Sequence, residues 1–293
     1  MKKYALFITL FIFSLQLLAQ NTDDLRKEIT QIIAAKKADV GVSIIGIEPH
    51  DTLSINGAKH YPMVSVFKFH IALTVLTKVD RGELSLHQKI LIKKSELLEN
   101  TWSPFREKYP KGDVYITLKE ALQWMIIHSD NNLCDILIRL VGGVEAVEKC
   151  IDSPNFIIKL DEEGMHKSFE SQMINTTTPV YSTQLLKTFF EKKFLKAKTT
   201  KFLYRTMAKT AVGKNRIKGK LPKNTEVAHR TGSSDTTDAG LTGAINDIGI
   251  VKLPNGKHIF IAVFVHNTTE KFAIGEEIIA NISQATWNYF NKK

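Results

Sequence analysis

Ser65 and Lys68, three residues apart, are the pair in this chain whose types and spacing best suit covalent catalysis. Apolar residues recur at helical spacing from Phe67 to Val79, so both side chains lie on one face of a predicted helix. A serine hydroxyl needs a neighbouring base to take its proton, and a lysine can be that base when burial or nearby cations keep it neutral. Pro62 favours a turn just upstream, which places Ser65 at the helix N-terminus, where unpaired backbone N–H groups meet developing negative charge.

A second polar cluster, Ser129-Asp130-Asn131, lies between two amphipathic stretches, 118–127 and 133–141. Ser and Asp are also common helix caps, so capping is an alternative interpretation of this cluster. In a catalytic role, Ser129 can relay a proton to a leaving nitrogen and Asn131 can hold a substrate amide.

A third cluster ends a predicted strand with Arg230, Thr231, Gly232 and Ser233. The arginine can fix an anionic group and favour a neutral lysine nearby. Thr231 and Ser233 can hydrogen-bond a carboxylate, and Gly232 lets the backbone approach closely. The backbone N–H groups of Ser233 and Ser65 would together form an oxyanion hole. A polar strand end that runs into a turn is the alternative.

The three clusters occur in the order Ser-x-x-Lys, Ser-Asp-Asn and basic-Thr-Gly, a set shared by class A β-lactamases and penicillin-binding proteins. The chain therefore resembles a class A serine β-lactamase over essentially its whole mature length. This resemblance implies hydrolysis of the β-lactam ring of penicillins and cephalosporins through an acyl ester on Ser65, which would confer antibiotic resistance. It implies a small-molecule β-lactam as the binding partner, with no cofactor and no metal.

A fourth element distinguishes the two families. The segment Glu162-Glu163-Gly164-Met165-His166, ahead of Pro179, resembles the class A Ω-loop, in which a glutamate activates the water that hydrolyses the acyl-enzyme. Glu162 is the matching position, and Asp161 and Glu163 are the neighbours with which it could be confused. A solvated acidic turn is the alternative. Penicillin-binding proteins lack this glutamate and stay acylated, so its presence favours turnover.

Several positions depart from the usual pattern of the family. Arg230 replaces a lysine, and His166 stands where most members have asparagine. An Arg–Asp pair that clasps the Ω-loop is replaced by Leu160 and Asn175. Met165-His166, Asn175 and Asp135 resemble the extended-spectrum, cephalosporin-hydrolysing subgroup, whose Ω-loop is differently folded and roomier. We expect Asp135 to accept a hydrogen bond from Asn175 and so replace the missing clasp.

Two further binding residues follow from the resemblance. Trp102 matches an aromatic gatekeeper at the rim of the substrate groove, with ordinary surface packing as the alternative. Arg216 matches an arginine that some members supply to the substrate carboxylate, a task that suits its planar fork. Lys214 and Lys218 are the alternatives for that cation.

There are two rival functions, of which the first shares three of the motifs. One is a D-alanyl-D-alanine carboxypeptidase or transpeptidase, and the other is a β-lactam sensor domain without turnover. A sensor should carry membrane-spanning segments, and the sequence shows none beyond the apolar stretch within residues 1–20.

The elements that must position these residues follow from the periodicity. Residues 61–209 are mostly helical, whereas period-two patterns occur near both ends, at 40–47, 51–55, 225–231, 242–253 and 258–266. Helices are predicted after residue 22 and over 272–290. This order predicts an α/β (α+β) two-lobed fold, an antiparallel sheet flanked by terminal helices with an inserted helical lobe. We expect one domain, 21–293, with an α/β lobe (21–60 and 210–293) and a helical lobe (61–209).

Residues 1–20 read as a signal peptide, with Lys2-Lys3 ahead of an apolar core at 5–18 and Ala19 as a plausible cleavage residue. A transmembrane anchor is the alternative, but the apolar run is short for a bilayer. We expect an exported, periplasmic protein that is monomeric and has no membrane anchor after cleavage. Cys134 and Cys150 can form a disulfide in an oxidising compartment or remain free thiols.

The composition agrees with a folded protein. The 293 residues are 43% hydrophobic, which is enough for a substantial core. The net charge of +10 is spread along the chain without dense aromatic interleaving. We therefore expect weak attraction to anionic surfaces and no nucleic-acid binding.

Overall fold

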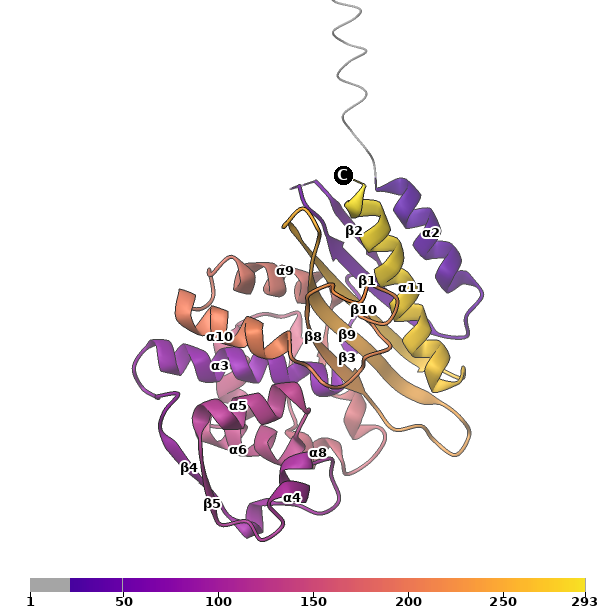
Figure 1. Cartoon of the computed structure of the whole chain (residues 1–293). Coiled ribbons are helices and arrows are strands. Elements are labelled where there is room, and N and C mark those ends of the chain that lie inside the picture. Colours follow the sequence, from indigo (N-terminus) through magenta and orange to yellow (C-terminus); the bar gives the residue numbers. More distant parts are fainter. Residues whose placement is uncertain (1–21, 49, 293) are drawn as a thin grey trace, which may run out of the picture.

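The computed structural model describes residues 22–48 and 50–292, and its larger sheet joins strands from both ends of the chain (Figure 1). The sheet is antiparallel, with the strand order β2-β1-β10-β9-β8. Its strands are β1 (Asp39–Ile45), β2 (Thr52–Ile55), β8 (Val227–Ser233), β9 (Thr242–Lys252) and β10 (His258–Thr268). β8 is therefore an edge strand. The predicted signal peptide lies outside the described residues.

Two terminal helices cover one face of this sheet. α2 (Asp23–Ala34) and α11 (Phe272–Asn291) lie side by side along it (Figure 1). α2 buries Leu25 and Ile29, four residues apart, and α11 buries Ile278 and Ile282 at the same spacing. These apolar stripes pack with the sheet in one hydrophobic cluster, as their helical period requires.

The middle of the chain supplies most of the helices. The helices are α3 (Lys68–Asp80), α4 (Pro104–Lys108), α5 (Leu118–Ile127), α6 (Asn131–Val141), α7 (Val144–Ile151), α8 (Glu162–Met165), α9 (Pro179–Phe190) and α10 (Ala197–Met207). Short 3₁₀ turns are η1 (Val64–Phe67), η2 (Lys94–Glu96) and η3 (Ser171–Met173). Five short strands also occur, β3 (Tyr61–Pro62), β4 (Lys89–Ile92), β5 (Val114–Thr117), β6 (Phe156–Ile157) and β7 (Thr176–Thr177).

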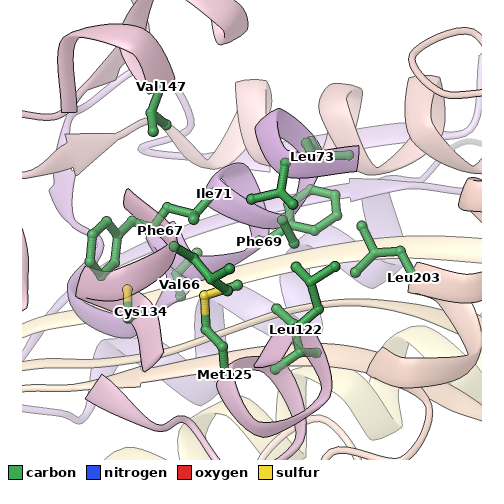
Figure 2. Packing of buried hydrophobic residues seen from close by; sticks show 14 of the residues in the cluster. Val66, Phe67, Phe69, Ile71, Leu73, Leu122, Met125, Cys134, Val147 and Leu203 are labelled. Atoms are coloured by element: carbon green, nitrogen blue, oxygen red, sulfur yellow. The ribbon is translucent and has the colours of Figure 1, made fainter. Parts of the chain in front are cut away.

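α3 is the central element of this part of the fold. Every residue from Lys68 to Leu76 is buried, so the helix is surrounded on all sides. Figure 2 shows its apolar side chains packed among those of neighbouring helices, including Leu122, Val147 and Leu203. Because α3 cannot shift without opening this core, it fixes the position of the residues at its N-terminus.

α9 belongs in sequence to the predicted helical lobe but packs on the sheet. It contacts β1 and β10, and a buried hydrogen bond of 2.8 Å joins the Ser43 and Thr183 hydroxyls. The division into lobes at residues 61 and 209 stays a prediction. Within the described residues, no helix has both the length and the apolar character needed to cross a bilayer.

Candidate active site

A cavity of about 320 Å³ opens where the helices meet the edge strand β8. It is lined by Val64, Ser65, Trp102, Ser129, Asn131, Glu162, Met165, His166, Gln172, Val212, Gly213, Arg216, Thr231, Gly232, Ser233, Ser234 and Asp235. Ten residues predicted from the sequence are in this lining, and Lys68 and Arg230 lie buried beneath it. Of the predicted set, Asp135 and Asn175 do not line the cavity.

Ser65 and Lys68 meet as their spacing predicts. η1 carries Ser65, and α3 begins at Lys68, so the two side chains lie one turn apart. The Lys68 Nζ atom donates to Ser65 Oγ at 2.9 Å and to Asn131 Oδ1 at 2.6 Å. Lys68 is fully buried and forms an ion pair with Glu162. An amine and a carboxylate therefore lie against the same hydroxyl.

Glu162 is the acidic residue that faces Ser65. Ser65 Oγ donates to Glu162 Oε1 at 3.5 Å, and only 3% of the glutamate is exposed. Its two acidic neighbours do not face Ser65. Asp161 caps α8 by accepting a hydrogen bond from Gly164 N at 2.9 Å, and the side chain of Glu163 is exposed. The three acidic residues, which the sequence could confuse, therefore have different positions in the structure, and only Glu162 faces Ser65.

His166 and Asn131 join the Ω-loop to α6. His166 Nδ1 lies 2.7 Å from the carbonyl oxygen of Glu162, and its Nε2 lies 3.4 Å from Asn131 Nδ2. Because the carbonyl can only accept and the amide nitrogen can only donate, the proton belongs on Nδ1. His166 therefore holds the backbone of Glu162 and the amide that also binds Lys68.

Ser129 lies between Ser65 and Arg230. Its Oγ donates to Ser65 Oγ at 3.3 Å and accepts from Arg230 Nη2 at 2.7 Å. Ser129 has φ of 60°, a conformation that costs a non-glycine residue about 1–3 kcal/mol and that often marks functional sites. Arg230 is fully buried, and burial lowers the pKa of its guanidinium to about 10.

Asp130 does the capping that was the alternative interpretation of its cluster. Its Oδ1 accepts from Leu133 N at 2.9 Å, and its Oδ2 accepts from Phe105 N at 2.7 Å. It also accepts from the Ser103 hydroxyl, which ties the segment after Trp102 to α6. The Ser129-Asp130-Asn131 motif therefore both caps α6 and contributes side chains to the cavity.

Gly232 brings β8 against the segment that carries Ser65. A Cβ atom at 232 would lie 2.4 Å from Met63 O and 3.2 Å from Ser65 N, so only glycine fits. Ser234 N donates to Ala244 O at 2.9 Å. Successive amides along a strand point to opposite sides, so the Ser233 N–H points away from β9 and towards the cavity. This is the side on which Ser65 lies.

Arg216 lines the cavity although it is only 3% exposed. Its Nη2 donates to Ser233 Oγ at 2.6 Å, and its Nη1 donates to Gly232 O at 2.9 Å. Its Nε pairs with Glu276 of α11 at 3.1 Å. The sequence analysis missed Glu276, because nothing in its local pattern marks a partner sixty residues away.

The predicted hydrogen bond between Asp135 and Asn175 is wrong. Asp135 instead accepts from the backbone N–H groups of Glu162 and Glu163, at 2.8 and 3.0 Å. Asn175 accepts from Lys159 N at 2.8 Å and donates to Leu160 O at 2.7 Å. Each side chain is occupied by backbone groups of the loop, so neither needs the other. They fasten the Ω-loop at two separate points.

The carboxyl of Asp135 makes folding stability pH-dependent. Burial, with the charges of Glu162 and Asp161, raises its pKa from 3.8 to about 7. Between these values the folded chain binds more protons than the unfolded chain, so this contribution is fully present below about pH 4 and is lost as the pH rises through 7. The contribution is at most about 4 kcal/mol. Between pH 5 and 8, we expect the free energy of unfolding to fall more in the wild type than in Asp135→Asn, as measured by urea titration at each pH. The same dependence of the unfolding free energy on pH in both proteins would contradict this prediction.

A pair of hydrogen bonds between Gln172 and Asp235, here called the latch, was not predicted from the sequence. Gln172, in η3, donates through Nε2 to Asp235 Oδ2 at 2.6 Å and accepts from Asp235 N at 3.0 Å. Both residues line the cavity, so the latch sets its width between the Ω-loop and the end of β8. Trp102 lies at the rim, 55% exposed, with its Nε1 bonded to His128 O at 2.9 Å.

Cys134 and Cys150 are free thiols, the first buried and the second partly exposed. Among the described residues, no group of three His, Cys, Asp or Glu is placed to hold a metal ion.

Comparisons with known proteins all point to the same family. The sequence model of the beta-lactamase enzyme family matches residues 24–290. Beta-lactamase VEB-1 of Pseudomonas aeruginosa is 41% identical over 297 residues, which cover 100% of this chain and 99% of the relative. The extended-spectrum beta-lactamase PER-1 of Pseudomonas aeruginosa is 37% identical over 272 residues, with 92% and 88% covered.

A solved structure confirms the predicted fold. The crystal structure of the TLA-1 extended-spectrum beta-lactamase superposes with a TM-score of 0.90 and 48% sequence identity. The match covers 93% of this chain and all of that one. The α/β (α+β) two-lobed architecture is therefore shared.

Proposed function

The chain belongs to the beta-lactamase enzyme family as a class A enzyme that hydrolyses the β-lactam ring, and we propose that Ser65, Lys68, Ser129 and Glu162 carry out this reaction. The observation that carries the proposal is the buried pairing of Lys68 and Glu162 around the Ser65 hydroxyl. A nucleophile needs a base in direct hydrogen-bond contact or one water away, and here Lys68 Nζ lies 2.9 Å and Glu162 Oε1 lies 3.5 Å from Ser65 Oγ.

In the first step, Ser65 Oγ attacks the lactam carbonyl. Its proton passes to Glu162 through water, or to Lys68 after Lys68 has given a proton to Glu162, its partner in the ion pair. The backbone N–H groups of Ser65 and Ser233 stabilise the developing oxyanion, a contribution of about 3–4 kcal/mol for each donor. Ser129, held by Arg230 at 2.7 Å, then passes a proton to the departing ring nitrogen.

In the second step, Glu162 takes a proton from a water molecule that attacks the ester. The attack releases Ser65 and the ring-opened product. Asp135 and His166 hold the backbone on which Glu162 is carried, so they act as positioning residues for this step.

The substrate contacts outside the reacting atoms come from β8 and its neighbours. Thr231 and Ser233 bind the substrate carboxylate, and Arg216 supports that contact through its 2.6 Å bond to Ser233 Oγ. Asn131 binds the side-chain amide, and Trp102 closes the rim. Cephalosporins are the preferred class, since relatives of this chain are extended-spectrum enzymes by name.

The latch between Gln172 and Asp235 gives a test of this preference. Gln172→Ala removes both of its side-chain bonds and widens the cavity at the Ω-loop. We expect kcat/KM for a cephalosporin with a bulky side chain to rise about fivefold relative to benzylpenicillin, because a hydrophobic or steric change of this size is worth about 1 kcal/mol. Steady-state kinetics with both substrates measures the ratio, and an unchanged ratio would exclude a role for the latch.

One experiment tests the proposed reaction. The pure protein is mixed with nitrocefin, and colour and intact mass are followed together. Continuous colour formation without a lasting adduct is expected. A burst of one equivalent with a persistent adduct would instead favour a D-alanyl-D-alanine carboxypeptidase or transpeptidase, or a sensor domain.

The remaining expectations also belong to the proposal. The mature protein is a monomeric periplasmic domain, residues 21–293, released by cleavage of residues 1–20. Fractionation of cells, with N-terminal sequencing of the periplasmic protein, tests both statements.

A further inference from the structure

A second cavity, of about 460 Å³, lies at the opposite end of α3 from Ser65. Its lining includes Lys78, Val141, Ala146, Lys149, Cys150 and Phe194. These residues come from the last turns of α3, the end of α6, α7 and the connection between α9 and α10. The helix rises about 1.5 Å per residue, so Lys78 is about 15 Å from Lys68 along the axis. The two cavities share no lining residue.

The rim of this second cavity carries an excess of positive charge. Three of its four basic side chains pair with two glutamates: Glu83 pairs with Lys78 at 3.1 Å and with Arg81 at 4.0 Å, and Glu191 pairs with Lys193 at 2.6 Å. Lys149 is exposed and forms no ion pair with the described residues. A ligand with a negative group would complete the charge balance here.

The wall below the rim is apolar. Val141 is 3% exposed, and Ala146, Phe194 and the partly exposed Cys150 line the same cavity. A volume of 460 Å³ falls in the range of about 300–1,000 Å³ that is usual for small-molecule sites. A concave site of this size accommodates one small molecule.

We propose that this cavity is a second binding site, for a small amphipathic carboxylate. The apolar body of the ligand lies against Val141, Ala146 and Phe194, and its carboxylate meets Lys149 and the neighbouring cations. The inference does not depend on the proposed function, because it concerns a separate cavity and needs no turnover.

The first test measures binding by stability. Decanoate, below its micelle-forming concentration, is expected to raise the Tm of the full mature chain, because a ligand that binds only the folded state stabilises it. Decanol, which has the same chain without the charge, is the ligand control. Lys149→Glu should weaken decanoate binding about tenfold by replacing attraction with repulsion, and Ala146→Trp should abolish it by filling the cavity. Lys223→Glu, an exposed reversal in the loop before β8, should leave binding unchanged.

The second test uses Cys150 as a reporter. A Cys150 thiolate attacks 4,4′-dithiodipyridine, forming a mixed disulfide and releasing one pyridine-4-thione. Cys134 is fully buried and should not react. Decanoate is expected to slow the reaction at Cys150 in the wild type and not in Ala146→Trp. Because this readout is local, it remains informative if a variant is less stable.

Three results would overturn the proposal. One is an equal Tm rise with decanol, which would reduce the site to apolar adsorption. Another is undiminished decanoate binding in Lys149→Glu and Ala146→Trp. The third is co-sedimentation with phosphatidylglycerol vesicles, lost in Lys149→Glu, without any binding of free decanoate, which would make this surface a membrane contact.

Discussion

Glu162→Ala is expected to trap the acyl ester on Ser65. Glu162 is the buried carboxylate within reach of the Ser65 hydroxyl, and its loss removes the base that activates water. A general base contributes about 10²–10⁴-fold, so we expect nitrocefin turnover to fall about a thousandfold. Acylation continues through Lys68, so intact mass should show a lasting adduct of one equivalent.

Glu163→Ala is the matched control for this experiment. Glu163 is the same residue type one position along, but its side chain is exposed and only its backbone N–H contacts Asp135. Turnover in this variant should stay within about twofold of the wild type, since surface substitutions rarely cost more than about 0.5 kcal/mol. Equal losses in the two variants would show that loop disruption, and not the carboxylate, explains the effect.

Lys68→Met is expected to slow acylation itself. It removes the amine that lies 2.9 Å from Ser65 Oγ and leaves Glu162 buried without its cation. Breaking a buried ion pair costs about 3–5 kcal/mol of stability, and loss of a base costs at least about a hundredfold in rate. Stopped-flow measurement of adduct formation, with thermal unfolding on the same samples, separates the two effects.

The contrast between the two variants is informative. Glu162→Ala should accumulate an adduct quickly, whereas Lys68→Met should accumulate it slowly. Lys78→Met, at the other end of α3, is the control, because its amine lies at the protein surface and pairs with Glu83. Rapid acylation in Lys68→Met would leave Glu162 as the base for both steps.

Local periodicity predicts the pairing of Ser65 with Lys68, whereas most of the other site residues were predicted from the resemblance of their motifs to those of class A β-lactamases. The one-turn spacing of Ser65 and Lys68 survives in the structure, and Glu162 stands out from Asp161 and Glu163 once the path of α8 is known. The strands at both ends of the chain also follow from their period of two, with bounds that shift by a few residues.

The features that were missed depend on contacts between distant segments. The sequence does not reveal that Asp135 binds two backbone amides instead of Asn175, because that choice depends on the path of the loop. The pairing of Arg216 with Glu276 joins residues far apart in the chain. Side-chain partners of this kind compete with backbone groups at similar distances, and only the three-dimensional arrangement decides between them.

The pairing of β1 with β10 has a consequence for synthesis of the protein. Asp39 lies opposite His266, so β1, the first strand in the described chain, cannot complete its pairing until β10, the last one, has been made. β9 reaches β1 only through β10, and β8, which carries Gly232 against Ser65, is held to the sheet by β9. A nascent chain that lacks its final strands therefore has no assembled cleft, and activity should appear only when the C-terminal segment has emerged. Such long-range pairing also makes this kind of sheet slow to fold, which leaves the growing polypeptide extended for longer.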